Sequence, residues 1–202
     1  MKKFFLFSVL IFLSFSLSAQ TGLETGIVIG GGKGNISTDL HPGFSEFTQL
    51  DMTNKVHFVL GYRFRLKPVT SSFFFDLDLN AGIKLWGYEP YAKSVDSSGG
   101  RAHSPGPDCT YIYGSFAATA NYLVYNGLSV GVGVEPRYYF YQSGSEMNTP
   151  AIDVPVLTKL SYNFRFIELG FTYKLGIFNT LKNSYINSLR FNDWQLSVFI
   201  PF

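Results

Sequence analysis

Residues 55–66 read KVHFVLGYRFRL, and this stretch decides the fold class. Every even position carries a large apolar side chain, whereas the odd positions carry mostly charged, polar or small ones. Successive side chains of a β-strand point to opposite faces. The stretch therefore predicts a strand with one aromatic and aliphatic face and one face that holds Lys55, His57, Arg63 and Arg65.

The same alternation returns after a short break at residues 67–70. In residues 73–85 the odd positions are apolar, and the even positions include Asp76, Asp78 and Lys84. Lys67 and Pro68 suit a tight turn, so the two stretches predict an antiparallel hairpin. A four-residue turn would pair Leu66 with Ser71 and place Arg63 diagonal to Asp76, within reach of an ion pair.

Six further stretches alternate in the same way, which gives eight strands in all. They are residues 22–34, 112–124, 128–140, 154–164, 167–177 and 194–202. Their connections alternate too: residues 67–70, 125–127 and 163–166 are short, and residues 35–54, 87–110, 142–153 and 179–192 are long and polar. Short periplasmic turns and longer external loops are typical of outer-membrane barrels. The pattern predicts an all-β fold, an eight-stranded antiparallel transmembrane β-barrel with up-and-down meander order.

One stretch allows a second interpretation. Residues 109–134 contain no charged side chain, so a membrane helix is conceivable there. The glycines at 127, 131 and 133 disfavour a helix and suit a crowded barrel interior.

Pro136 and Pro155 lack an amide hydrogen, so each can remove a bond from the strand ladder. The favoured interpretation is a bulge, or a strand end above the membrane. The alternative is a weak seam that could admit a lipid chain.

The first residues predict export. Lys2 and Lys3 precede the apolar residues 4–15, and Ser16, Ser18 and Ala19 follow. This is the three-part layout of a secretory signal peptide, with an uncleaved anchor as the alternative. We expect residues 1–19 to be the signal peptide, cleaved near Ala19, and residues 20–202 to form the barrel domain in the bacterial outer membrane.

Composition excludes several classes of function. The chain has 16 basic and 14 acidic residues, and loss of residues 1–19 leaves 14 of each. No basic stripe indicates nucleic-acid binding. Cys109 is the only cysteine, so an internal disulfide or a multi-cysteine zinc site is excluded.

The inward face predicts an ion-pair network in the lumen. An eight-stranded barrel is wide enough only for side chains or one small ligand, and buried charges must be paired. We expect these residues to form the network: Arg63, Arg65, Asp76, Asp78, Lys84, Glu135 and Arg137. Further charges expected inside are Glu24, Lys55, Lys159, Arg165, Glu168 and Lys174, with His57 beside Asp78. A narrow path for ions or small solutes is the alternative.

The sequence shows little evidence of a catalytic or metal-binding motif. His41 and His103 lie in expected loops, and the glycines at 30–32 lack the spacing of a phosphate loop. The carboxylates of the expected loops, Asp153 among them, show no calcium-loop spacing. We therefore expect no catalytic residue, no cofactor and no metal site, with a lipid-modifying enzyme as the least favoured function.

The end of the chain carries a resemblance. Residues 194–202, WQLSVFIPF, alternate and close on Phe202. This resembles the assembly signal of bacterial outer-membrane proteins, and the whole chain resembles the small-barrel superfamily of the OmpA membrane domain, OmpX and OmpW-like proteins. The resemblance implies that the barrel-assembly machinery acts on Phe202, and that outer-membrane lipid surrounds the barrel. We therefore expect an envelope-structural or surface-interaction role. Loops 35–54 and 87–110 are candidates for an extracellular ligand, because residues such as Tyr88, Tyr91 and Arg101 are of types favoured at interfaces.

Overall fold

The computed structural model describes residues 21–40, 48–68, 71–92, 108–143, 152–177 and 186–202. The expected signal peptide, residues 1–19, and the centres of the four long connections lie outside the described residues. The described chain is built from strands. Their bounds are β1 Thr21–Leu40, β2 Thr48–Pro68, β3 Phe73–Ala92, β4 Asp108–Tyr125, β5 Leu128–Val134, β6 Arg137–Ser143, β7 Ile152–Asp153, β8 Val156–Asn163, β9 Glu168–Leu175 and β10 Ile186–Pro201.

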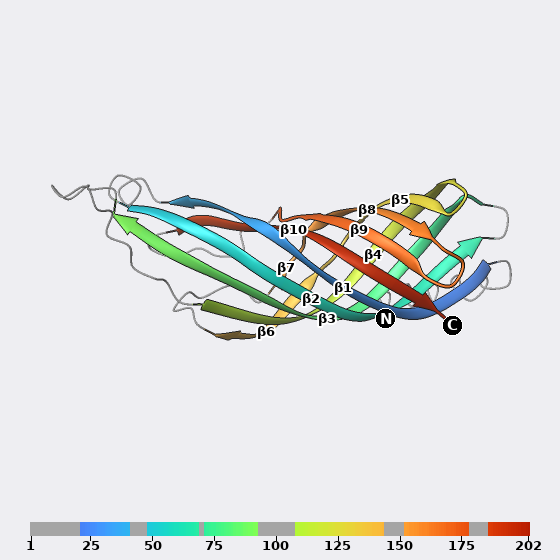
Figure 1. The fold of residues 1–202 in the computed structure, drawn as a ribbon, viewed down its shortest axis with the longest axis horizontal. Coiled ribbons are helices and arrows are strands. Elements are labelled where there is room, and N and C mark those ends of the chain that lie inside the picture. The colour runs from blue at the N-terminus through green and yellow to red at the C-terminus, as the bar shows by residue number, and fades with distance from the viewer. Residues whose placement is uncertain (1–20, 41–47, 69–70, 93–107, 144–151, 178–185) are drawn as a thin grey trace, which may run out of the picture.

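The strands close into a barrel in chain order (Figure 1). Each pairs antiparallel with its neighbours, and β1 pairs with β10 to close the ring. β5 and β6 both pair with β4 and together make one wall strand interrupted at Pro136. β7 and β8 likewise make one strand interrupted at Pro155. The barrel therefore has eight antiparallel strands in meander order, which confirms the predicted fold class.

The helical interpretation of residues 109–134 is wrong, because these residues form β4, the turn at Asn126–Gly127, and β5. Asn126 and Gly127 have φ angles of 33° and 90°. Glycine reaches such positive angles without steric cost, so this turn needs a residue like Gly127. Among the described residues, no helix has the length and apolarity needed to span a bilayer.

The strands are longer than the alternation predicts. β1 continues to Leu40, β2 begins at Thr48 and β10 begins at Ile186, so much of the expected loops 35–54 and 179–192 is strand. The register continues without interruption from Ile27↔Ile200 to Asp39↔Ser188 along β1 and β10. The apolar alternation does not predict these strand ends, because many of their side chains are polar.

The first hairpin has a different register from the predicted one. Leu66 pairs with Phe75 instead of Ser71, so Arg65 faces Asp76 and Arg63 faces Asp78. The Ser71 amide donates to the Pro68 carbonyl at 3.3 Å, and the Ser71 hydroxyl accepts from the Phe73 amide at 2.9 Å. The first residues of β3 pair with β4 alone, so the connection is wider than a four-residue turn.

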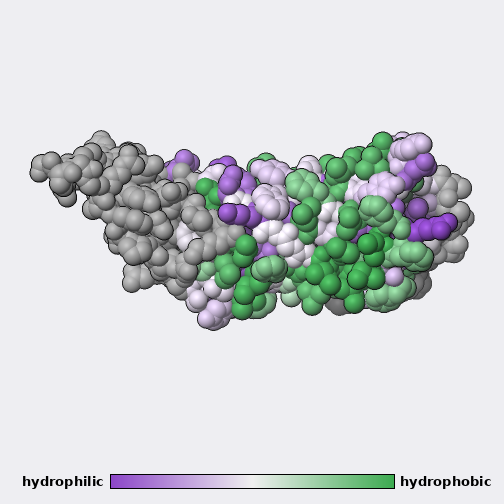
Figure 2. Space-filling model, in the orientation of Figure 1, coloured by the Kyte–Doolittle hydropathy of each residue, from purple (hydrophilic) through white to green (hydrophobic). Residues whose placement is uncertain are grey.

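The two faces of the wall differ in chemistry. Along β2, Phe58, Leu60 and Phe64 are exposed on the outside, and Arg63 and Arg65 are buried inside. Figure 2 shows hydrophobic side chains spread over the half of the barrel that carries the short turns. An apolar exterior around a polar interior is the arrangement that a bilayer requires of a barrel.

Candidate functional site

The lumen near the short turns is filled by what we call the turn-end network. Its members are Arg63, Arg65, Lys159, Asp76, Asp78 and Glu168. Arg63 donates from Nε and Nη2 to the two oxygens of Asp78, at 2.7 and 2.8 Å. Arg65 holds Asp76 in the same two-point manner, at 2.7 and 3.0 Å. Both pairs form because the register of β2 and β3 sets each arginine directly opposite its carboxylate.

The other half of the turn-end network crosses the lumen. Lys159 on β8 donates to Asp76 and to Glu168, both at 2.9 Å. Glu168 on β9 also lies 2.7 Å from Arg65 and 3.1 Å from Arg63. The three cations therefore meet three carboxylates from four strands, and the network is neutral.

A second set of charges, the central network, lies further from the short turns. Its members are Lys84, Arg137, Lys174, Glu135, Asp153 and Asp193. Asp193 accepts from Lys84 at 2.7 Å and from Arg137 at 3.1 Å. Glu135 lies 2.6 Å from Lys174 and 3.3 Å from Arg137. This network also joins three cations and three carboxylates.

Aromatic side chains fill the lumen next to the central network. The aromatic cluster consists of Trp86, Tyr111, Tyr113, Tyr139 and Phe191. The Trp86 ring meets Tyr111 and Phe191 edge to face, with centroids 5.4 and 5.8 Å apart. Lys84 Nζ lies 4.1 Å from the Phe191 centroid and the Arg137 guanidinium 5.3 Å from that of Tyr113. The cations are thus covered by ring faces as well as paired.

The structure places the seven residues of the expected network inside the barrel, but in two groups. Arg63, Arg65, Asp76 and Asp78 lie in the turn-end network, and the remaining three, Lys84, Glu135 and Arg137, lie in the central network. The Arg63–Asp76 contact exists at 3.6 Å, yet Asp78 is the closer partner. The four-residue turn behind that expectation is wrong.

Two further expectations about the interior are wrong, and a third concerns a side chain that the structure does not describe. Arg165 is exposed in the turn between β8 and β9, with a φ of 76°, because the strand ends at Asn163. His57 faces Lys84 in the register and does not lie opposite Asp78. The side chain of Lys55 lies outside the described ones.

Sequence reasoning missed two carboxylates and the aromatic cluster. Asp153 was assigned to a loop, but it is buried opposite Arg137. Asp193 precedes the expected start of the last strand; extending the odd-numbered inward face by one position from Gln195 would have found it. The odd positions of Tyr111, Tyr113 and Tyr139 mark them as inward-facing, but large aromatics had been expected on the lipid side.

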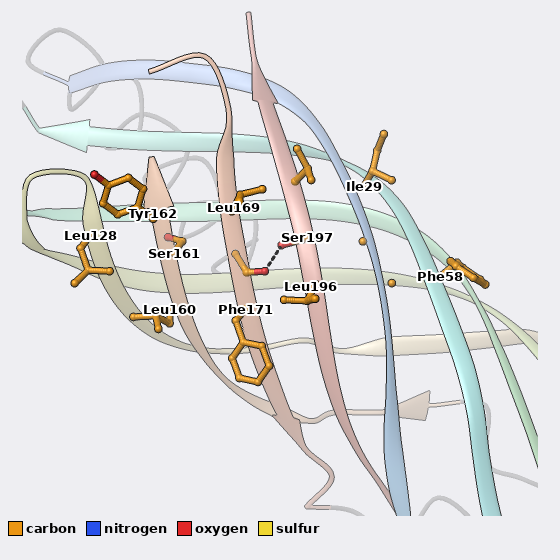
Figure 3. A pocket seen from close by; sticks show the side chains of 14 residues that line it. Ile29, Phe58, Leu128, Leu160, Ser161, Tyr162, Leu169, Phe171, Leu196 and Ser197 are labelled. Carbon is orange, nitrogen blue, oxygen red and sulfur yellow. Dashed lines mark hydrogen bonds between the residues drawn. The ribbon is translucent and has the colours of Figure 1, made fainter. Parts of the chain in front are cut away.

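Two hollows adjoin these networks, and a third lies on the outer wall. A cavity of about 30 Å³, lined by Arg63, Asp78, Glu135 and Lys174 among others, separates the two networks. A polar pocket of about 270 Å³ opens at the short-turn end. On the outer wall, an apolar groove of about 680 Å³ runs past Leu160, Phe171 and Leu196 (Figure 3), where small inward residues such as Ser197 and Gly170 lie behind it. Such an outer groove faces acyl chains when the barrel spans a membrane.

The prolines interrupt two seams of the wall at one level. The Phe116 amide donates to the Pro136 carbonyl and the Glu135 amide to the Pro155 carbonyl, both at 3.0 Å. Antiparallel partners normally exchange two such bonds, and proline cannot return one. The register runs unbroken past both prolines, so no bulge exists there; the nearest irregularity is between Ile112 and Tyr113.

Within the described part of the chain, no group of three or more His, Cys, Asp or Glu side chains converges in a way that could hold a metal ion. The histidine side chain that the structure describes, His57, is buried between charged neighbours and faces no hydroxyl in the register. The arrangement can therefore fill and stabilise the lumen, and it offers no assembled nucleophile and base.

Comparisons with known proteins identify likenesses of fold. No protein-family profile matches the sequence, and no curated protein matches it. Among solved structures, Ail, the attachment invasion locus protein of Yersinia pestis, in complex with the heparin analogue sucrose octasulfate, aligns at 13% identity and a TM-score of 0.47, covering 89% of this chain and 99% of that chain. The outer membrane protein OprG from Pseudomonas aeruginosa aligns at 11% identity and a TM-score of 0.43, covering 89% and 94%. At these identities the likeness concerns the fold alone. In its closed ring of eight antiparallel strands, the chain has the architecture of the small outer-membrane β-barrels that its sequence resembles.

Proposed function

We propose that this chain is a closed, non-enzymatic barrel of the bacterial outer membrane that serves an envelope-structural or surface-interaction role. The observation that carries the proposal is the filled middle of the lumen. A barrel without a water path acts through its outer wall and its two ends.

The filled level is continuous around the ring. Lys84, Trp86, Tyr111, Phe191 and Asp193 have 0% of their surface accessible to water. The other strands contribute buried side chains at this level, namely His57, Glu135, Arg137, Asp153 and Lys174. β1 contributes Gly34, where an added Cβ would collide with the Asn192 carbonyl and the Asp193 carboxylate. Among the described residues, these buried side chains support a lumen that is closed to water at this level.

The charges of the lumen support a structural role as well. Each network is neutral, so neither presents the excess of one sign that selects cations or anions in a pore. Six ion-paired cations also bind strands that are distant in sequence, such as β3 to β10 through Lys84 and Asp193. The paired charges thus hold the ring together from inside.

The exterior supports the membrane location. Large apolar side chains are exposed on the outer face, for example Phe58, Leu60, Leu79, Val132 and Leu196. Soluble monomers rarely expose apolar patches larger than a few hundred Å². A bilayer also requires that every backbone group of the wall be paired, which closure of the ring provides.

Single-channel recording in planar bilayers tests the proposal. We expect the refolded protein to insert without conductance steps, because the central network and the aromatic cluster fill its lumen. The alternative of a narrow channel is favoured by one observation, the polar pocket at the short-turn end, and it predicts steady openings.

If the unaltered protein shows no conductance, a variant that should open the lumen serves as the positive comparison. Arg137→Ala leaves three carboxylates of the central network against two lysines, so water should enter and brief cation-selective openings should appear. Lys33→Ala, at an exposed position of β1, is the matched control and should stay silent. Steady openings of the unaltered protein would refute the closed lumen.

A further inference from the structure

The proposed function gives no role to the polar pocket of about 270 Å³ at the short-turn end. Its lining includes residues of two short hairpin turns, and these turns lie at one end of the barrel (Figure 1). Its walls come from β1, β2, β3, the turn between β4 and β5, and the turn between β8 and β9. Charged side chains in it include Glu24, Arg65, Lys67, Arg165 and Glu168.

Two of these cations, Lys67 and Arg165, are available to bind a ligand. Arg65 is held by Asp76 and Glu168 and has no charge to spare for a ligand. Lys67 and Arg165 are exposed, and neither makes an ion pair with another described residue. Glu24 is about a third exposed and lies 3.8 Å from Arg65, beyond hydrogen-bond distance. Among the described residues, the open part of the pocket thus has two cations without an ion pair and one weakly held carboxylate.

The backbone under Arg165 adds an independent observation. Its φ of 76° places an arginine in the left-handed region, which costs a residue with a side chain about 1–2 kcal/mol. The Asn163 side chain accepts from the Arg165 amide at 2.8 Å and helps to hold this conformation. Glycine or asparagine would adopt it with less strain, so the fold alone gives no reason for a long cationic side chain at this rim.

We propose that this pocket binds a phosphate group between Lys67 and Arg165. A phosphate offers several oxygens to cations that approach from different sides, and its negative charge balances the excess of one positive charge. Glu24 lines the same pocket, and its carboxylate can accept from an amine or hydroxyl of the ligand. The exposed rings of Phe164 and Phe166 flank Arg165 in the chain.

The phosphate has two conceivable sources, a soluble phosphoester or a phospholipid headgroup of the adjoining leaflet. The proposal depends on the proposed function only for the compartment that the pocket faces. Conductance tests the closed lumen, and phosphate binding tests the pocket, so the two can fail separately.

The experiment is a titration followed by backbone amide NMR, with the protein refolded in a maltoside detergent that carries no phosphate. One arm adds inorganic phosphate and the other adds monomeric dihexanoyl phosphatidylglycerol, both against chloride at matched ionic strength. We expect saturable shifts at Asn126, Gly127 and residues 163–168. Lys67→Gln and Arg165→Asn should each weaken binding about tenfold, the effect of losing one charged contact.

The variants separate binding from folding. Arg165→Asn suits the left-handed backbone, so the barrel should resist denaturant at least as well as before while losing affinity. Lys33→Gln, at an exposed position of β1 outside the pocket lining, should bind as the unaltered protein does. Saturation by inorganic phosphate identifies a soluble ligand, and saturation by the lipid alone identifies a headgroup. No saturation in either arm, equal shifts with chloride, or unchanged affinity in both variants would overturn the proposal.

Discussion

At the scale of single residues, each inward charge is stabilised by a partner of opposite charge that lies directly beside it, and not by the total number of charges in the lumen. Arg63 and Arg65 each meet a carboxylate on the directly opposite residue of β3, and ring faces cover the guanidinium groups; Arg65 lies 4.5 Å from the Phe74 centroid and Arg63 4.9 Å from that of Phe199. Buried pairs of this kind add little net stability, but removal of one partner leaves an uncompensated charge.

A double-mutant cycle on Arg63 and Asp78 tests this pairing. Either alanine substitution alone should lower the free energy of unfolding by about 3–5 kcal/mol, and the double variant should lose clearly less than the sum. Unfolding in urea, measured by tryptophan fluorescence in lipid vesicles, gives the four values. Arg63→Ala with Asp193→Asn is the control, because these residues belong to different networks and their effects should add. Additive effects for Arg63 and Asp78 would contradict the pairing.

At the scale of elements, we expect the wall strand formed by β5 and β6 to be the weakest part of the ring. It lacks one ladder bond toward β4 at Phe116 and one toward β8 at the Glu135 carbonyl, both at the level of the prolines. Lipid cannot replace a missing bond. The hypothesis that this seam opens locally and admits a lipid chain therefore remains a prediction, now with its two missing bonds identified.

Hydrogen exchange tests the seam. Amides in residues 134–140 and 154–160 should exchange faster than those in residues 56–64 and 75–83, where the ladder is continuous. Pro136→Ala and Pro155→Ala each restore a donor, so each should slow exchange in its own seam. Pro68→Ala, at the end of β2, should leave both seams unchanged. Equal protection of all four segments would remove the case for a lateral opening.

At the scale of the whole molecule, the ring closes where the first and last strands meet. β1 and β10 pair over a long register, and the Phe202 amide donates to the Thr25 carbonyl at 2.9 Å. The Phe202 ring is 73% exposed and lies 6.0 Å from the Tyr62 ring. The last residue thus completes the closing seam and offers an accessible aromatic side chain outside it.

Deletion of Phe202 tests its role as an assembly signal. Export should continue, because the expected signal peptide at residues 1–19 is unchanged, but the amount of folded, heat-modifiable protein in the outer membrane should fall severalfold. Phe202→Tyr keeps the aromatic ring and should assemble normally. Trp194, exposed on β10, is expected to anchor the opposite interface. A normal amount of folded protein in the deletion variant would contradict a role of Phe202 in assembly.

Much of the barrel follows from the sequence by itself. The alternation in residues 55–66 and 73–85 assigned each side chain to the inside or the outside, because the two-residue repeat of a strand is a local property of the backbone. The count of eight strands and their meander order followed from the same pattern and the alternating connection lengths. The inward position of Arg63, Asp78 and Arg137 needed no knowledge of the neighbouring strands.

Only the tertiary structure decided which inward residues meet. Arg63 faces Asp78 because the connection to β3 is wider than a tight turn, and a shift in register changes every partner at once. Asp193 reaches Lys84, 109 residues away in the chain, and no local pattern encodes that contact. The aromatic cluster lies beside the expected polar network for the same reason. Alternation tells which way a side chain points, but the closure of the ring decides what it meets there.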